Sequence, residues 1–426
     1  MTAKLKVHTL GCKVNQYETE LVRQALHTIG YDDADSETPA DVCIVNTCTV
    51  TDTGDAKSRQ VIRRMHRDNP EARIIVMGCY ATRAPKEVAA LPGVADVLTD
   101  KRELPDLMTR FGVIDVPTGL SGFAGRLRAY VKVQDGCMLR CSYCIIPKVR
   151  PALTSRPLPD IVGEVQRLVD AGHREVVLTG IHLGHYGVDW NRRRPRDQWT
   201  RLSDLLEALV AIDGDCRIRL SSIEATEVTR QLIDVMATYS DRIVPHLHLC
   251  LQSGSDSVLR RMRRRWSKRM FLDRCELLRQ SLQTPAITTD VIVGFPGETE
   301  QEFRETLQTC QDAGFSKIHA FPFSRRRGTP AAEMPDQVSK EVKAERIDRL
   351  EALEADLRSR YFDSLVGREL EMMIESIQDN ETSGTTCRYA PAKMIRKPNH
   401  QRGQLIRGIA TKNHLDHVMI EPIDVP

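Results

Sequence analysis

The sequence predicts an α/β protein with three parts: an amino-terminal parallel sheet covered by helices, a central partial (β/α)6 barrel and a small carboxy-terminal β-barrel. Three observations lead to this prediction. Residues 1 to about 115 alternate strand-like and helix-like segments. Six apolar strand-like runs, separated by helical ones, follow up to about residue 355. Short alternating runs begin near residue 367. We place the domains at 1–118, 123–356 and 360–426.

Length and composition limit the class of protein. The 426 residues are enough for about three domains. Lys and Arg total 61 against 58 Asp and Glu, so the net charge is only +3 and any nucleic-acid surface must be local. Twelve cysteines without a signal peptide favour a reducing cytoplasm, where disulfides are not expected. No apolar run reaches membrane-spanning length, so we expect no membrane partner.

Each of three strands predicted in the first domain ends in a cysteine. LKVHTLGC ends at Cys12, DVCIVNTC at Cys48 and ARIIVMGC at Cys79. Open parallel sheets place ligand sites beyond the carboxyl ends of their strands, so these thiols should converge. Three thiolates can hold an iron-sulfur cluster with one open iron. Three buried structural thiols are the alternative. Cys43 lies inside its strand and should be a small core residue.

Helix-start signals accompany two of these cysteines. Asn15 and Thr51 are residue types that cap helices, and each follows a strand end closely. We expect both to cap helices whose amino ends point at the thiols. Helix amino-termini stabilise negative charge, which thiolate-ligated iron carries.

A second trio follows the strand-like run AYVKVQD. Cys137, Cys141 and Cys144 have the spacing C-x-x-x-C-x-x-C, which places three thiolates around one face of an iron-sulfur cube and leaves the fourth iron open to a small molecule. The alternative is a zinc knuckle. Zinc usually takes four ligands, and the next cysteine, Cys216, is far along the chain.

The six central strands are expected to end in polar or glycine-rich turns that face the barrel's ligand site. The predicted strands are AYVKVQD, EVVLTG, RIRLSS, HLHLCLQ, ITTDVIVG and KIHAFPFS. Thr179-Gly180 and Glu224 follow the second and third strands, and Gly294 follows the fifth. Glycine permits close approach of the backbone to a ligand, although each turn singly has an ordinary structural interpretation.

At these residues the chain resembles a known family. The pattern C-x-x-x-C-x-aromatic-C, with Tyr143 as the aromatic residue, is typical of radical S-adenosylmethionine enzymes. The segments GCKVNQYET, NTCTVT, GCYA, VLTGIHLGHYG, HLHLCLQSGSDSVLRRM and TTDVIVGFPGETEQEF resemble methylthiotransferases within that group.

The resemblance implies two 4Fe-4S clusters: an auxiliary one on Cys12, Cys48 and Cys79, and a radical-generating one on the second trio. It also implies two S-adenosylmethionine molecules, one giving a methyl group to sulfur and the other a 5′-deoxyadenosyl radical. Thr179-Gly180 matches the turn that meets the amino group of S-adenosylmethionine, Gly294 matches the turn near its adenine, and Glu224 is a candidate for its ribose or methionine portion. No catalytic acid or base is assigned, because such chemistry belongs mostly to the cofactors.

The substrate implied is tRNA. GCKVNQYET most resembles the branch that converts C2–H of N6-threonylcarbamoyladenosine, beside the anticodon, to C2–SCH3. The alternatives are isopentenyladenosine in tRNA, a ribosomal-protein aspartate, or a noncatalytic iron-sulfur or zinc RNA-binding protein. The reaction also implies a low-potential electron donor and a sulfur donor as partners.

Several basic residues are candidates for RNA contacts. The run RRMRRRWSKRM surrounds one Trp with cations, which could combine phosphate contacts with stacking, and the alternative is a solvated helix face. The carboxy-terminal part loosely resembles a TRAM domain, with a purely structural barrel as the alternative. Departures from the family at Pro151 and Thr154 put a loop contact in doubt, with Arg156 retained. The candidates are Arg156, Arg263, Arg264, Arg265, Trp266, Lys268, Arg388 and Lys393.

Overall fold

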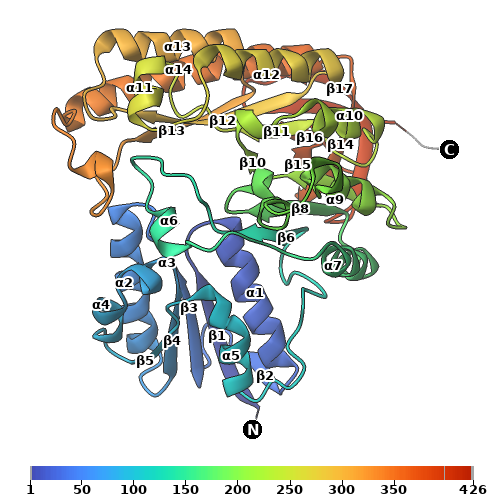
Figure 1. The fold of residues 1–426 in the computed structure, drawn as a ribbon. Coiled ribbons are helices and arrows are strands. Elements are labelled where there is room, and N and C mark those ends of the chain that lie inside the picture. The colour runs from blue at the N-terminus through green and yellow to red at the C-terminus, as the bar shows by residue number, and fades with distance from the viewer. Residues whose placement is uncertain (1, 398, 424–426) are drawn as a thin grey trace.

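The computed structural model describes residues 2–397 and 399–423 and confirms the predicted α/β architecture (Figure 1). The amino-terminal part is a five-stranded parallel sheet of order β2-β1-β3-β4-β5. Its strands are β1 (Ala3–Thr9), β2 (Tyr31–Asp33), β3 (Val42–Thr47), β4 (Arg73–Gly78) and β5 (Val94–Val97). Its helices are α1 (Lys13–His27), α2 (Asp52–Asp68), α3 (Cys79–Arg83), α4 (Pro85–Ala89) and α5 (Leu104–Arg110).

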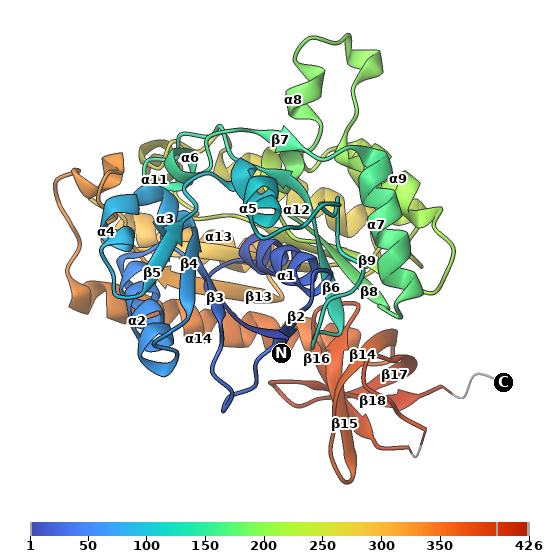
Figure 2. The same ribbon diagram turned by 90° about the horizontal axis from the view of Figure 1, so that it is seen from below.

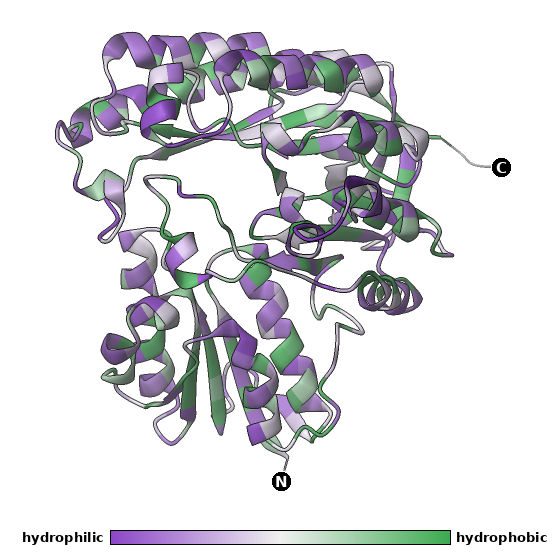
Figure 3. Ribbon diagram, in the orientation of Figure 1, coloured by the Kyte–Doolittle hydropathy of each residue, from purple (hydrophilic) through white to green (hydrophobic). Residues whose placement is uncertain are grey.

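The central strands of this sheet are buried on both faces. Every residue of β3 is buried, and its side chains alternate between two cores: Ile44 packs with Leu5 on one face, while Cys43 and Val45 pack with Ile62 on the other. Figure 3 shows the corresponding apolar colouring of β3 and β4 between helices with polar outer faces. A parallel strand covered by helices on both sides is expected to be apolar throughout. Cys43 is the core residue that its position predicts.

The central part contains the six predicted parallel strands, divided between two sheets of order β7-β6-β8-β9 and β10-β11-β12-β13. The run RIRLSS splits at Ser221 into β9 and β10, which is where one sheet ends and the next begins. The strands are β6 (Arg128–Asp135), β7 (Thr154–Ser155), β8 (Glu175–Gly180), β9 (Arg217–Leu220), β10 (Ser222–Ile223), β11 (His246–Leu249), β12 (Ala286–Val293) and β13 (Lys317–Pro322).

Helices cover the outside of this open barrel (Figures 1 and 2). They are α7 (Leu158–Asp170), α9 (Leu202–Val210), α10 (Arg230–Thr238), α11 (Asp256–Arg261), α12 (Lys268–Ser281), α13 (Glu300–Ala313) and α14 (Lys340–Leu365). Two further short helices lie elsewhere: α6 (Ile146–Val149) packs against α3, and α8 (Val188–Asn191) lies on a segment that projects from the barrel in Figure 2. Short 3-10 turns are η1 (Lys101–Glu103), η2 (Leu183–His185), η3 (Arg196–Gln198), η4 (Ala225–Glu227) and η5 (Pro330–Ala332). In the described part of the chain, no helix has both the length and the apolar composition to cross a membrane.

The carboxy-terminal part is a closed five-stranded barrel of order β14-β15-β16-β18-β17, as predicted. Its strands are β14 (Glu369–Ile377), β15 (Glu381–Thr386), β16 (Pro391–Ile395), β17 (Leu405–Asn413) and β18 (Val418–Pro422). The long helix α14 runs without a break from the outside of the central barrel into this domain. Its last residues, Phe362 and Leu365, join the core of the small barrel. The small barrel is therefore held against the central one (Figure 2).

A buried carboxylate holds these two barrels together. Glu175, at the start of β8, is fully buried and accepts hydrogen bonds from Arg128, Arg217 and Arg219 at 2.6–2.8 Å. Burial by itself would raise the pKa of Glu175, but the arginines hold it well below its usual range. The same arginines reach the small barrel. The Arg217 side chain donates to the carbonyl and carboxylate of Glu371, and that of Arg219 donates to the Thr386 carbonyl.

Replacing this carboxylate should loosen the junction. In Glu175→Gln the three guanidinium groups keep their charge and lose the buried counterion, so we expect the free energy of unfolding to fall by about 3–5 kcal/mol. Urea unfolding of the variant against wild type measures this. Glu351→Gln, an exposed position on α14, is the control and should change stability little. Equal stabilities of Glu175→Gln and wild type would show that the junction does not depend on Glu175.

Candidate functional site

The three amino-terminal cysteines meet at one edge of the sheet. Cys12 and Cys48 follow β1 and β3, and Cys79 follows β4 directly, on strands that are neighbours in the sheet. The loops approach closely: a Cβ atom on Gly11 would lie 2.9 Å from Cys48 Cβ and 3.0 Å from its Sγ. Gly11 also has φ +95°, a conformation that favours glycine. The parallel topology thus brings three thiols together from positions 36 and 31 residues apart in the sequence.

The predicted caps behave differently from each other. Thr51 caps α2, since its side chain accepts a hydrogen bond from the Gly54 amide. The prediction for Asn15 is wrong, because α1 begins one turn earlier and Cys12 occupies the cap position. Asn15 is buried instead, and its side-chain nitrogen donates to the carbonyls of Leu10 (2.9 Å) and Thr47 (3.0 Å). It thereby ties the loops that carry the first two cysteines.

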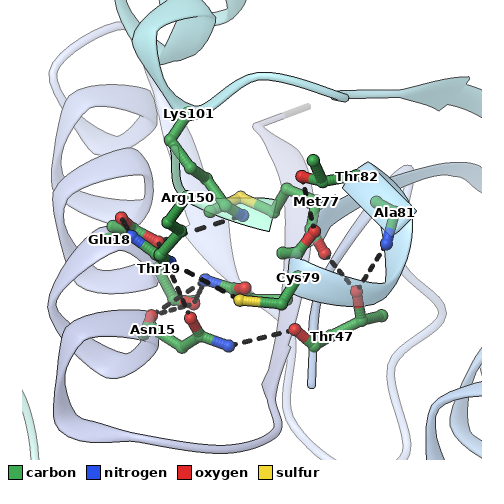
Figure 4. Close-up of polar contacts among 12 residues, drawn as sticks. Asn15, Glu18, Thr19, Thr47, Met77, Cys79, Ala81, Thr82, Lys101 and Arg150 are labelled. Atoms are coloured by element: carbon green, nitrogen blue, oxygen red, sulfur yellow. Dashed lines mark hydrogen bonds and ion pairs between the residues drawn. The ribbon is translucent and has the colours of Figure 1, made fainter. Parts of the chain in front are cut away.

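Arg150 contacts both cysteine regions, and Figure 4 shows its side chain beside Cys79, Glu18 and Asn15. Its guanidinium Nε lies 3.5 Å from Cys79 Sγ, and its Nη2 donates to the Asn15 side chain at 3.0 Å. Its backbone carbonyl accepts from the amide of Cys137, the first cysteine of the second trio. The residue is buried, with 3% of its surface exposed. One arginine therefore contacts a thiol of the first trio with its side chain and the loop of the second trio with its backbone.

A set of buried charges surrounds Arg150. Its guanidinium bonds both oxygens of Glu18 at 2.8 Å, and Asp135 also accepts from it at 2.8 Å. Lys132 pairs with the same two carboxylates, and Lys101 lies 4.0 Å from Glu18. Burial alone would raise the pKa of Glu18, but these cations hold it well below its usual value. Three basic side chains and two carboxylates therefore form one buried network beside Cys79.

A second arginine fastens the amino-terminal domain to the central barrel. Arg326, fully buried after β13, donates to Asp52 at 2.6 Å and to Asp55 at 2.7 Å on α2. Asp55 also accepts from Arg83 on α3 and from Thr49 beside Cys48. The loops behind Cys48 and Cys79 are therefore fixed by contacts from both domains.

The second trio lies on the loop after β6. The backbone of this loop is anchored at Ser142, whose amide donates to the Met262 carbonyl (3.0 Å) and whose hydroxyl donates to the Arg261 carbonyl (2.7 Å). Arg264 Nη1 donates to Cys141 Sγ at 3.0 Å and lies 3.4 Å from the Tyr143 hydroxyl. Its other nitrogen bonds Glu224 at 2.6 Å. Arg264 thus donates to a sulfur of the second trio, as Arg150 does to a sulfur of the first.

A histidine pair beside Cys137 was not singled out from the sequence. His182 Nδ1 lies 3.8 Å from Cys137 Sγ, and the ring stacks on His185 at 3.7 Å. Its Nε2 faces Glu227 at 3.4 Å. Both histidines belong to the segment VLTGIHLGHYG, so the motif was visible. What the sequence could not show is that the turn after β8 folds back over the second trio.

Thr179, Gly180, Glu224 and Gly294, which are predicted to meet S-adenosylmethionine, all lie at or after carboxyl ends of strands. Thr179 and Gly180 end β8, and a Cβ on Gly180 would lie 2.9 Å from Gln134 Oε1. Glu224 is buried, and one of its oxygens has no hydrogen-bond partner among the described residues. Gly294, with φ +72°, donates its amide to Glu298, and a Cβ there would meet Lys343 of α14 at 2.4 Å. The glycine at 294 is thus also required for packing.

A large cavity opens where the three domains meet. Its volume is about 740 Å³, and its walls come from α1, from strands β6, β9, β11, β12 and β13, and from the small barrel. Lys13, which follows Cys12 in the sequence, lines the cavity. Its size is in the range of small-molecule and cofactor sites.

The predicted RNA candidates are scattered. Arg263 and Arg265 are exposed, Lys268 is half-buried, and Lys393 pairs with Glu381 at 3.1 Å. The predicted stacking role of Trp266 is wrong: 5% of the residue is exposed, and its ring lies 3.9 Å from the Arg264 guanidinium carbon. The side chain of Arg264 donates hydrogen bonds to Cys141 and Glu224.

Two more of these candidates lie away from the exposed Arg263 and Arg265. Arg156 donates to the buried Glu164 (2.6 Å) and to the Thr118 carbonyl, so it fixes the interdomain loop and does not present its charge to solvent. Arg388 lines the cavity.

The residues present fit iron-sulfur clusters. Each trio offers three thiols and no fourth protein sulfur is needed. Burial raises the pKa of the Cys144 thiol to about 12, so thiolate at this position requires a metal ion to displace the proton. Arg150 and Arg264 each aim N–H donors at a sulfur, which is the contact that an anionic cluster accepts.

Comparison with known proteins first gives the class. Residues 4–100 match the Uncharacterized protein family UPF0004, and residues 131–310 match the Radical SAM superfamily. The radical S-adenosylmethionine methyltransferase TsrM from Kitasatospora setae has a similar structure, with a TM-score of 0.55 at 13% identity over 75% of this chain and 73% of that chain. The S-adenosylmethionine radical enzyme OxsB gives a TM-score of 0.54 at 11% identity, over 84% and 56%. Fold and sequence together define a radical S-adenosylmethionine enzyme.

Close relatives narrow the assignment. The threonylcarbamoyladenosine tRNA methylthiotransferase MtaB of Bacillus subtilis is 45% identical over 413 residues, covering 91% of this chain and 89% of the relative. The protein of the same name from Chlamydia pneumoniae is 39% identical, over 89% and 88%. A tRNA-2-methylthio-N(6)-dimethylallyladenosine synthase from Mycobacteroides abscessus is 36% identical, over 95% and 84%. The chain belongs to the radical S-adenosylmethionine methylthiotransferase family, in its MtaB branch.

Removing the first trio should remove one cluster. After anaerobic reconstitution we expect about eight irons per chain in wild type and about four in the Cys12/Cys48/Cys79 triple alanine variant, with matching losses of sulfide. Iron analysis and electron paramagnetic resonance measure this. Cys43→Ala, in the same domain but outside the trio, should keep wild-type iron. Equal iron in the triple variant and wild type would contradict an auxiliary site.

Arg150 should control the stability of the domain junction. Arg150→Met leaves Glu18 without its bidentate partner in a buried position, so we expect the unreconstituted protein to lose about 3–5 kcal/mol of unfolding free energy. Arg150→Lys keeps the positive charge but cannot make the two parallel hydrogen bonds of a guanidinium group. It should therefore recover part of the lost unfolding free energy. The control is Arg140→Met, exposed on the same loop. Urea midpoints for the three variants give the comparison, and an unchanged midpoint in Arg150→Met would refute the role.

Proposed function

We propose that this protein is a tRNA methylthiotransferase that converts C2–H of N6-threonylcarbamoyladenosine beside the anticodon to C2–SCH3. Support comes from the relatives of that name at 39–45% identity over most of both chains. The observation that carries the proposal is the pair of cysteine trios, which Arg150 joins through its guanidinium to Cys79 and through its carbonyl to the amide of Cys137. Sulfur insertion needs both a radical source and a sulfur source within reach of one substrate atom.

The cofactors are two 4Fe-4S clusters and S-adenosylmethionine. We assign Cys12, Cys48 and Cys79 to the auxiliary cluster and Cys137, Cys141 and Cys144 to the cluster that binds S-adenosylmethionine. When bound, these groups supply the radical, the methyl group and the sulfur. The chain's own residues hold the ligands in place: Arg150 and Arg264 donate to sulfurs, while Asn15 and Ser142 fix the ligand loops. Thr179, Gly180, Glu224 and Gly294 are assigned to S-adenosylmethionine.

The substrate base must leave the anticodon stack to reach the cavity, since reacting atoms inside a nucleic-acid stack are inaccessible. The exposed cations Arg263 and Arg265, together with Lys393, are proposed to contact the tRNA backbone. A low-potential electron donor and a sulfur donor complete the reaction. We place the protein in the cytoplasm, where tRNA and a reducing environment for free thiols are found together.

Product analysis tests the proposal. Reconstituted enzyme, S-adenosylmethionine and dithionite are incubated with tRNA that carries N6-threonylcarbamoyladenosine, and the digested nucleosides are measured by mass spectrometry. We expect the 2-methylthio nucleoside from wild type. The Cys12/Cys48/Cys79 triple alanine variant should still cleave S-adenosylmethionine to 5′-deoxyadenosine but give no methylthio product, because only the radical site remains.

Parallel incubations with tRNA carrying isopentenyladenosine and with ribosomal proteins test the substrate. Methylthiolation of either in preference to threonylcarbamoyladenosine would refute the substrate assignment while keeping the reaction. Absence of 5′-deoxyadenosine from wild type with intact, reducible clusters would refute the enzyme.

A further inference from the structure

The cavity between the domains receives one cation from each of them. Lys13 comes from the first turn of α1, Arg219 from β9 of the central barrel, and Arg388 from the loop between β15 and β16 of the small barrel. Six Lys or Arg residues line the cavity against three Asp or Glu residues, so its wall is positive. A positive, partly enclosed cavity favours an anionic ligand group.

These three cations keep donors free. Within residues 2–397 and 399–423, Lys13 makes no hydrogen bond or ion pair. Arg219 is 4% exposed and uses Nε and Nη2 on Glu175 and Thr386, while its Nη1 is a buried donor without a partner. Arg388 has no carboxylate within ion-pair distance among the described residues, and its Nε is also a buried donor without a partner.

Other cations of the same wall are already neutralised. Lys317 pairs with Glu354 at 3.0 Å, and Arg128 pairs with Glu175 and Glu375. Nη1 of Arg219 is a donor that an acceptor on a ligand would satisfy, and a buried donor gains free energy from such a partner. Arg219 shares Glu175 with Arg128 and Arg217, so one carboxylate faces three guanidinium groups at that position. Among the described residues, the charge without a carboxylate partner of its own is therefore on Lys13 and Arg388, and Arg219 adds a free donor beside them.

The wall beside these cations is aromatic. Tyr389 stacks on His246 with ring centroids 4.5 Å apart, and the Arg219 guanidinium carbon lies 5.6 Å from the Tyr389 centroid. Tyr389 has φ +59°, which is uncommon for a residue with a bulky side chain. Such strained conformations gather at ligand sites, where the surrounding structure holds them. The small barrel thus inserts Tyr389 and Arg388 into the central barrel as part of the cavity wall.

We propose that this cavity recognises the carboxylate of an anionic N6 substituent on the substrate adenosine, through Lys13, Arg219 and Arg388. The inference rests on the proposed function and names the group that the site selects. A threonylcarbamoyl group ends in a carboxylate and a hydroxyl, whereas a dimethylallyl group is apolar and would leave these cations without a counterion. Guanidinium and ammonium donors on a carboxylate form charge-assisted hydrogen bonds, which are stronger than neutral ones.

The test separates the carboxylate from other anions by neutralising it. Two anticodon stem-loop RNAs are prepared, one with N6-threonylcarbamoyladenosine and one with its carboxyl methyl ester, and their binding to reconstituted protein is measured by fluorescence anisotropy. We expect wild type to bind the acid about tenfold more tightly than the ester, since one charge-assisted contact supplies about that factor. Lys13→Met and Arg388→Met should each bring this ratio toward one.

The matched control is Lys317→Met, which removes a cation of the same cavity that already has a partner and should keep the wild-type ratio. Iron per chain is measured for every variant to check that the clusters are present. Arg388→Met is a second test variant, and it changes a residue outside the cysteine-bearing loops. Equal binding of acid and ester by wild type would overturn the proposal. So would equal weakening of both RNAs by Lys13→Met and Arg388→Met, which would assign these cations to the clusters or to RNA phosphates.

These outcomes are distinguishable from failure of the proposed function. If wild type methylthiolates both the acid and the ester RNA and binds them with equal affinity, the proposed function is supported and the proposed carboxylate site is refuted. If wild type methylthiolates neither RNA, the function itself falls.

Discussion

The buried contact between Arg150, Glu18 and Cys79 is the interaction on which the site depends. The amino-terminal sheet and the central barrel each carry three cysteines, and sulfur insertion requires that the two sets keep a fixed relation. Arg150 supplies it, because its backbone carbonyl accepts a hydrogen bond from the amide of Cys137 in the second trio, and its side chain contacts Asn15 and Cys79 beside the first. Burying a guanidinium is costly unless it is fully paired, and Glu18 and Asp135 meet that need. The domains are consequently locked in one arrangement.

Charge is used in the same way at both trios. Arg150 faces Cys79, and Arg264 faces Cys141. In each case a carboxylate, Glu18 or Glu224, accepts a hydrogen bond from the same guanidinium group and fixes its position. An anionic cluster bound to the thiols then lies in a field that the protein has fixed in advance, which stabilises the negative charge and orients the ligands. The arginines are thus a support for the cofactors and are not available to RNA.

The carboxy-terminal barrel is joined to the central barrel by hydrogen bonds and an ion pair of buried arginines. Its docking rests on Glu175 and three arginines, and it completes the wall of the cavity with Arg388 and Tyr389. Because α14 continues from one barrel into the other, and Arg128 and Arg217 at the starts of β6 and β9 contact the small barrel, the small domain is held at the amino ends of these strands. The small barrel therefore shapes the cavity that lies between the domains.

The sequence by itself determined the three-part architecture and the convergence of Cys12, Cys48 and Cys79, because parallel strands that each end in a cysteine must present those cysteines at one edge. It also determined the spacing of the second trio, which is local. Only the tertiary structure decided which charged residues are buried. The sequence suggests that Arg264, Trp266 and Arg156 lie at the surface. Nothing in the sequence around Arg150 indicates that its side chain is buried. Burial and ion pairing depend on partners more than a hundred residues away, such as Glu18 for Arg150 and Cys141 for Arg264, and residue type alone does not specify those partners.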